Sequence, residues 1–240
     1  MVNAFPGGTA VSWLDVYEDE SVDGLAGGTP HFHTASTEGY VVVSGRGALQ
    51  TINPSGFTET PLEAGVILWF TPGTIHRAVN LGSLRVLCIM QNAGLPEAGD
   101  AVMCFPDEVL ASADRYREAA TLPDGLGEDT AEAVRRRRDL GVTGFLQLRA
   151  AIAGGDNSAL ERMYNRAANL VQPRIEGWRS TWENTVRAET SHTDEVLTAL
   201  AMRDSSSLLA GGLQIGTPLV GDRKFGMCGR LRTFDLTPAA

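Results

Sequence analysis

Short apolar runs separated by turn residues dominate the first 95 residues of the chain. The runs lie at 10–23, 38–44, 48–53, 57–62, 66–70, 77–80 and 84–91, with a further short segment at 31–33. Gly, Pro, Asn and Ser separate them, and Gly45-Arg46-Gly47 and Leu81-Gly82-Ser83 are predicted to form tight turns. About eight short strands at this spacing predict an antiparallel sandwich or barrel over residues 1–95.

The pattern changes beyond residue 95. Residues 96–125 are rich in Gly, Pro and acidic residues, which predicts a connector with one short helix at 106–120. Residues 126–205 show helical periodicity, with helices expected at 129–141, 143–153, 158–172 and 193–203. Residues 206–240 contain two expected strands, 213–220 and 224–236, that can join the sheet of the barrel.

One apolar stripe in the helical region requires a partner. Ile175, Trp178, Trp182 and Val186 recur at steps of three and four residues, so they lie on one helix face. We expect this face to pack in the core. A lid over the mouth of the barrel and a contact in a dimer are the alternatives.

Three of the four histidines of the chain lie between Gly27 and Asn80. His31 and His33 are two residues apart in a strand-like segment, so their side chains point to the same face. The turn-prone residues 34–37 predict that Glu38 begins a new strand that folds back, and His76 follows the turn at Pro72-Gly73. These four side chains can converge on one point. Three nitrogens and a carboxylate oxygen suit a divalent transition metal such as Fe, Mn, Ni, Co or Zn.

At these residues the sequence resembles the cupin superfamily. The first motif of that family corresponds to His31, His33, Glu38 and Gly45, and the second to Gly65, Gly73, His76 and Asn80. The resemblance implies a double-stranded β-helix (jelly-roll) barrel with the metal inside, and by the same resemblance a homodimer is expected. Five residues are candidates for contact with the substrate or with the metal ligands, and a purely structural role is the alternative for each; they are Tyr40, Gln50, Trp69, Arg77 and Gln91.

The resemblance favours a metal-dependent enzyme that acts on a small molecule. An Fe(II) dioxygenase is the preferred interpretation, and this preference rests on the resemblance alone. A metal-dependent isomerase, lyase or decarboxylase is the alternative, and a barrel that binds a small molecule without turnover is a further one. No dinucleotide fingerprint, phosphate-binding Gly loop or Ser/His/Asp set competes with a metal site.

Composition and charge narrow the classes of partner. The chain is 43% hydrophobic and 20% charged, which is typical of a globular protein, and its net charge of −9 argues against binding to nucleic acid. The basic run Arg135 to Arg138 is expected to form a solvated helix face or local ion pairs. No secretory signal or apolar run of about 18 residues is visible, so no membrane contact is expected. Three widely spaced cysteines fit reduced thiols in a cytoplasmic protein.

Overall fold

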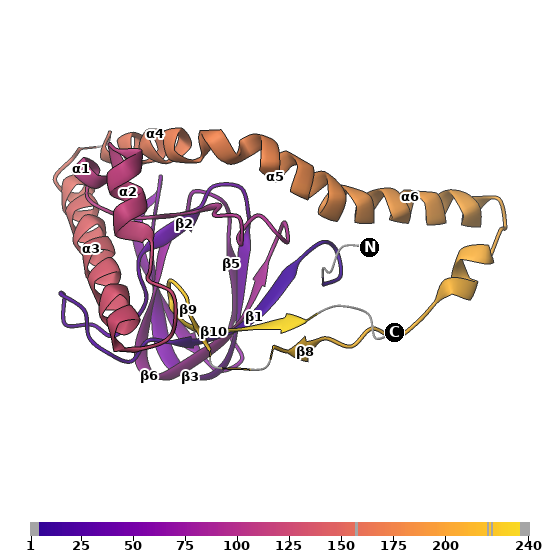
Figure 1. Cartoon of the computed structure of the whole chain (residues 1–240), viewed down its shortest axis with the longest axis horizontal. Helices are drawn as coiled ribbons and strands as arrows, with labels where there is room; N and C mark the ends of the chain where they lie inside the picture. The colour runs from indigo at the N-terminus through magenta and orange to yellow at the C-terminus, as the bar shows by residue number, and fades with distance from the viewer. Residues whose placement is uncertain (1–4, 157, 220, 222, 236–240) are drawn as a thin grey trace.

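The computed structural model describes residues 5–156, 158–219, 221 and 223–235. An antiparallel barrel forms the body of the molecule, and helices cover one of its ends (Figure 1). A long run of helices then extends past the barrel before the chain returns to it. The predicted mainly-β fold with a helical C-terminal region is confirmed. Among the described helices, none combines the length and the apolar character needed to cross a membrane.

The barrel sheet contains ten strands within the described residues. They are β1 (Ala10–Val16), β2 (His31–His33), β3 (Glu38–Asn53), β4 (Gly56–Glu63), β5 (Ile67–Phe70), β6 (Ile75–Met90), β7 (Ala101–Met103), β8 (Thr217–Pro218), β9 (Lys224–Phe225) and β10 (Gly229–Asp235). The main order is β4-β3-β6-β1-β10-β8, while β2 pairs with β6 and β7, β5 with β3, and β9 with β10. The C-terminal strand β10 therefore pairs with β1 inside the barrel sheet. Residues 220 and 236, at the ends of the two expected C-terminal strands, lie outside the described residues.

Strands β3 and β6 are each 16 residues long and replace two pairs of short strands. The sequence prediction of tight turns at 45–47 and 81–83 was wrong, because both strands continue through these residues. They pair with each other from Glu38↔Met90 to Ile52↔Ile75, and register shifts between Val42 and Gly47 bend them. Gly45 has φ +77°, and a Cβ there would lie 2.1 Å from the carbonyl oxygen of Ser83. Glycine at this bulge thus permits a bend and not a reversal.

The helices are α1 (Asp107–Leu110), α2 (Ala113–Ala120), α3 (Glu128–Ala153), α4 (Ala159–Val171), the 3₁₀ turn η1 (Gln172–Arg174), α5 (Ile175–Trp182), the π-helical turn η2 (Glu183–Arg187), α6 (Ala188–Ala201) and the 3₁₀ turn η3 (Ser206–Ala210). The expected connector at 96–125 holds strand β7 and two short helices in place of one. The break expected at Gly141 is absent, and α3 runs straight through it.

Gly141 allows close packing within α3. A Cβ at Gly141 would lie 2.6 Å from Cγ2 of Thr29, and one at Gly144 would lie 2.2 Å from the carbonyl oxygen of Cys104. These two glycines therefore let α3 pack closely on one end of the β2–β7 pair, where the backbone N–H of Cys104 donates to the carbonyl oxygen of Pro30 at 2.9 Å. Gly141, which predicted a helix break from the sequence, is instead needed for the close packing of α3.

Two hydrophobic clusters meet at strand β2. One fills the barrel and includes Leu14, Leu62 and Val86. The other lies between the barrel and the helices and includes Phe32 and Phe145. Because side chains alternate along a strand, Phe32 points to the helices while the histidines on either side of it point into the barrel. The helical region thus packs on the outer face of the strand that carries two of the four candidate ligands.

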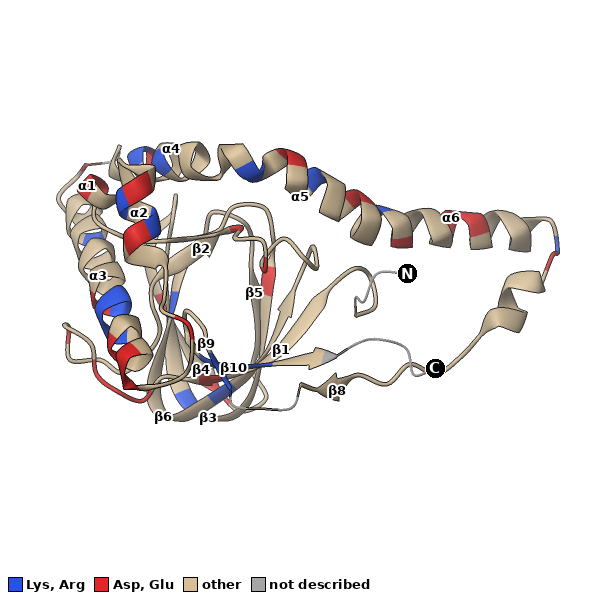
Figure 2. Cartoon of the chain, in the orientation of Figure 1, with Lys and Arg blue, Asp and Glu red and all other residues tan. Residues whose placement is uncertain are grey.

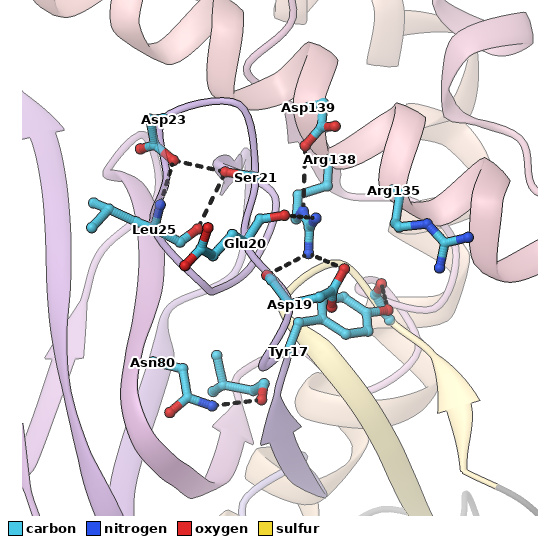
Figure 3. A network of polar contacts seen from close by, with 12 residues as sticks. Tyr17, Asp19, Glu20, Ser21, Asp23, Leu25, Asn80, Arg135, Arg138 and Asp139 are labelled. Atoms are coloured by element: carbon cyan, nitrogen blue, oxygen red, sulfur yellow. Dashed lines mark hydrogen bonds and ion pairs between the residues drawn. The ribbon is translucent and has the colours of Figure 1, made fainter.

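The basic run at 135–138 is divided between solvent and the interior. Arg135 and Arg136 form exposed ion pairs with Glu128 and Glu132, and charged residues are spread along helices α2 to α6 (Figure 2). Arg138 is buried and donates hydrogen bonds to the carbonyl oxygens of Asp19, at 3.0 Å, and Glu20, at 2.7 Å (Figure 3).

Its neighbour Arg137 is also buried, and it donates to the carbonyl oxygen of Gly226 at 2.8 Å. The expected local ion pairs account for half of the run. The other half attaches α3 to the barrel loop at 17–25 and to the C-terminal strands, which is a role that charge pattern alone does not reveal.

Candidate metal centre

His31, His33, Glu38 and His76 converge inside the barrel, as the strand alternation and the turns predicted. His31 and His33 come from β2, Glu38 begins β3 and His76 lies near the start of β6. Direct pairing of His31 with His76 across β2 and β6 brings those two imidazoles together, with ring centroids 4.2 Å apart. All four side chains are buried. Three separate strands therefore supply one cluster.

The potential ligand atoms of the four residues lie within 4.8 Å of one another. Glu38 Oε2 is 3.2 Å from Nε2 of both His33 and His76. Nevertheless, Glu38 Oε2 and His76 Nε2 are buried without a hydrogen-bond partner of acceptable geometry. Buried polar atoms without partners are costly, and a cation at the centre of the cluster would satisfy both. Three imidazole nitrogens and one carboxylate oxygen fit a divalent transition metal.

The other ring nitrogen of each histidine is bonded away from the cluster. Nδ1 of His31 lies 2.9 Å from the carbonyl oxygen of Thr29, and Nδ1 of His76 lies 3.0 Å from that of Thr74. Nδ1 of His33 lies 2.8 Å from Oδ1 of Asp100. When each Nδ1 donates its proton to these oxygens, each Nε2 presents a lone pair to the centre, which is the tautomer that a metal requires.

The charge states of the cluster follow from burial and from these contacts. Burial raises the pKa of Glu38, but the close contacts of its carboxylate with the imidazoles of His33 and His76 outweigh burial and lower that pKa overall. Burial and the neighbouring imidazoles lower the pKa of His31 well below its usual value. Burial acts against protonation of His33 as well, but the hydrogen bond with Asp100 and the nearby carboxylate of Glu38 raise its pKa to about 9. Without a metal, the cluster therefore holds one carboxylate and a protonated His33.

A cavity of about 500 Å³ opens directly from the cluster. His31, His33 and Glu38 line it together with residues of β1, β6, β10 and the helical segment α5–η2. Its lining includes the side chain of Tyr40, which is buried and has its hydroxyl 4.0 Å from Sγ of Cys228. Burial raises the pKa of Tyr40 well above its usual value, so its phenol keeps its proton.

Of the five candidates for contact with the substrate or the metal ligands, Tyr40 lines the cavity and four lie elsewhere. Glu38 pairs with Phe70 across β3 and β5, so the next residue along β5, Trp69, points outward and is 71% exposed. Arg77 follows His76 and points to the opposite face, where it pairs with Asp23.

The other two candidates, Gln91 and Gln50, do not line the cavity either, and their side chains form hydrogen bonds elsewhere. Gln91 follows Met90, the residue paired with Glu38, and its side chain accepts a hydrogen bond from the backbone of Thr37. Gln50 lies beyond the bulges of β3 and donates to Oε2 of Glu59 at 2.9 Å. Trp69, Arg77 and Gln91 each adjoin a residue that faces the cluster, or its strand partner, so strand alternation turns their side chains to the opposite face. The bulges of β3 shift this alternation, so Gln50 does not share the face of Glu38.

Several residues of the site were missed by the sequence analysis. Asp100 lies 67 positions beyond His33 in the loop before β7, and no spacing signal connects the two. Thr181 and Thr185, which line the cavity from the helical segment, look like ordinary polar positions of a helix. Cys228 was expected only to be one of three reduced thiols, and it lies on the cavity wall with Sγ 3.9 Å from Nδ1 of His31.

Comparison with known proteins agrees with the sequence motifs. Residues 21–90 match the family model described as the cupin domain. No curated protein sequence matches the chain.

Among solved structures, similar chains include an uncharacterized protein with a double-stranded β-helix domain from Klebsiella pneumoniae, at 21% identity and a TM-score of 0.29, over 36% of this chain and 69% of that one. A nucleoside dehydratase from Streptomyces is 19% identical with a TM-score of 0.32, over 41% of this chain and 69% of the other. A cupin protein from Bacteroides fragilis is 22% identical with a TM-score of 0.27, over 36% and 65%. Identities and TM-scores this low say nothing about activity.

The family match covers strands β2 to β6 and contains all four residues of the cluster. The expected double-stranded β-helix barrel is confirmed, and its buried His and Glu side chains can hold a metal ion. Residues 21–90 of the chain therefore form a cupin domain.

Proposed function

We propose that the chain is a metal-dependent enzyme that acts on a small organic molecule, and that it works as an Fe(II) dioxygenase. The observation that supports a metal-dependent function is the buried cluster of four donors, two of which lack a partner, at the inner end of a cavity. The preference for iron and dioxygen comes from the family resemblance. A homodimer and a small-molecule substrate belong to the same proposal.

In this proposal, His31, His33, His76 and Glu38 hold the metal through three Nε2 atoms and one carboxylate oxygen. A bound metal would supply Lewis acidity, and iron would add reactivity toward dioxygen. The carbonyl oxygens of Thr29 and Thr74 and the carboxylate of Asp100 keep the imidazoles in the binding tautomer. Because His31, His33 and Glu38 line the cavity, a small molecule in the cavity would have access to a metal held by the cluster.

Tyr40 is proposed to orient the substrate. Its phenol remains protonated across the physiological range, so it can donate a hydrogen bond to a substrate oxygen but not act as a base there. The apolar walls around it limit the access of water to the reacting group.

The test is elemental analysis of untagged protein, followed by anaerobic reconstitution with Fe(II) and exposure to dioxygen. An iron content of about one atom per chain, with uptake of dioxygen that depends on a small-molecule extract, supports the dioxygenase. Bound zinc, nickel, cobalt or manganese without dioxygen uptake would replace it with an isomerase, lyase or decarboxylase. Protein that binds no metal after reconstitution would refute the metal-dependent function and leave a non-catalytic binding barrel.

A further inference from the structure

Part of the wall of the cavity comes from the helical region and not from the barrel. Thr181, in α5, and Thr185, in η2, line the cavity together with the loop residues Gly94 and Pro96. Thr185 is buried although most of its neighbours in the helix are exposed. The π-helical turn at Glu183–Arg187 lies at this point, and such turns interrupt a regular helix at a specific residue.

Both threonines present an apolar surface to the cavity. The hydroxyl of Thr185 donates to the carbonyl oxygen of Thr181 at 2.9 Å, and that of Thr181 donates to Gly177 at 3.1 Å. Because their hydroxyls are bonded within the helix, their methyl groups are free for packing. A Cβ at Gly94 would lie 2.6 Å from Cγ2 of Thr181, so the loop and the helix meet at close range.

The remaining walls are largely apolar, with hydroxyl groups at Ser12, Tyr40 and Thr233. Leu14 of β1, Met90 of β6 and Leu231 of β10 line the cavity. Arg230 and Arg232 flank Leu231 on β10, and alternation turns them to the other face of the sheet. No Lys or Arg belongs to the lining within the residues described. The acidic residue at the rim, Glu97, accepts a hydrogen bond from the backbone of Gly94 at 2.9 Å.

This lining restricts the charge of the occupant. A negative group away from the metal would lose its hydration in the cavity and find no cation to compensate for that loss. An uncharged chain or ring would gain by leaving water, at about fourfold in affinity for each methylene buried. A cavity of about 500 Å³ is large enough for a ligand of this kind.

We propose that the cavity binds a small molecule with a single oxygen-containing head group and an uncharged, largely apolar body, and that Thr181 and Thr185 limit the length of that body. The head group lies at the His31/His33/Glu38/His76 cluster, and the body lies between Leu14, Met90 and Leu231 on one side and the two threonines on the other. This inference rests on the proposed metal centre and adds the substrate class and the residues that select it.

The test uses the zinc-loaded protein and three hydroxamic acids, whose head group binds metals. Acetohydroxamic acid has almost no body, hexanohydroxamic acid has an apolar one, and adipic acid monohydroxamate has the same chain length but ends in a carboxylate. Isothermal titration should show hexanohydroxamic acid binding at least about tenfold more tightly than acetohydroxamic acid, through its additional methylenes. The carboxylate-terminated compound should show no such gain.

Three variants test the helical wall. Thr185→Trp should reduce the advantage of the six-carbon chain to less than about threefold, because the indole would occupy the space of the body. Thr185→Val keeps the size and the apolar surface and should retain the full advantage. Thr190→Trp places the same indole on an exposed position of α6 and serves as the control.

Zinc content is measured on each sample, so that failure of the metal site can be distinguished from failure of the proposed ligand preference. A protein that binds zinc but prefers the carboxylate-terminated compound, or treats all three alike, would overturn this inference and leave the metal centre intact. An unchanged chain-length preference in Thr185→Trp would refute the role of the helical wall. A wild-type protein that binds no zinc would refute the proposed function and, with it, the placement of the head group.

Discussion

Removal of the Asp100 carboxylate should weaken metal binding without unfolding the barrel. Asp100 is fully buried and holds Nδ1 of His33 at 2.8 Å, which sets both the tautomer and the orientation of this ligand. Loss of such a contact to a metal-binding histidine costs about 10- to 100-fold in metal affinity. This equals about 1.4–2.8 kcal/mol of binding free energy.

Asp100→Ala should therefore lower the affinity for Zn(II) within this range, measured by competition with a chromophoric chelator. Asp100→Asn keeps an oxygen that can accept the proton of His33 but removes the charge, so its loss should be smaller than about tenfold. Asp107→Asn removes a charge from an exposed ion pair with Arg166, at 3.1 Å, and serves as the control. A folded Asp100→Ala protein with wild-type metal affinity would refute the positioning role of Asp100.

Three further predictions concern pH, helix packing and the buried arginine. Because the pKa of His33 is raised to about 9 in the metal-free protein, a metal must displace a proton from this ligand. The affinity for Ni(II), measured by calorimetry, should therefore rise from pH 6 towards pH 9, and an affinity independent of pH would contradict this assignment. Gly141→Ala should lower the free energy of unfolding in urea by about 1–3 kcal/mol, since the added Cβ would lie 2.6 Å from Thr29. Gly177→Ala, whose Cβ would meet nothing within 4 Å, should raise it by up to about 1 kcal/mol through higher helix propensity in α5. A change of the same sign in both variants would refute the packing argument. Arg138→Ala should cost about 2–4 kcal/mol of unfolding free energy through loss of two buried charged hydrogen bonds, and Arg135→Ala less than about 0.5 kcal/mol; equal effects would show that burial of Arg138 is not stabilising.

The four residues of the cluster could be predicted because their relation is local in the sequence. His31 and His33 share a face through strand alternation, and the turns before Glu38 and His76 bring the next strands back. The same logic failed for the long strands β3 and β6. Glycines at a bulge and glycines at a hairpin look alike in sequence, and only the pairing along the entire length of the two strands distinguishes them.

The outer parts of the site depend on packing between distant segments. The loop that carries Asp100 is held by α5 and η1. Trp178 of α5 donates to the carbonyl oxygen of Ala98 at 3.3 Å, and Arg174 of η1 donates to that of Gly99 at 3.1 Å. The apolar stripe on α5 and η2 was expected in the core, with a lid over the barrel mouth or a dimer contact as the alternatives. Trp178 is buried in the cluster between barrel and helices, while the adjoining face of α5 and η2 forms a wall of the cavity. Periodicity shows that a helix has an apolar face but not which surface covers it.

The most direct test of the metal centre is the metal content of three proteins after reconstitution, measured by elemental mass spectrometry. The wild type should hold about one divalent transition metal per chain, and His33→Ala, which lacks one of the four ligands, should hold far less while remaining folded. His192→Ala removes the one histidine outside the cluster, which is exposed on α6, and should match the wild type. Stoichiometric metal in a folded His33→Ala protein would contradict the assignment of the four ligands.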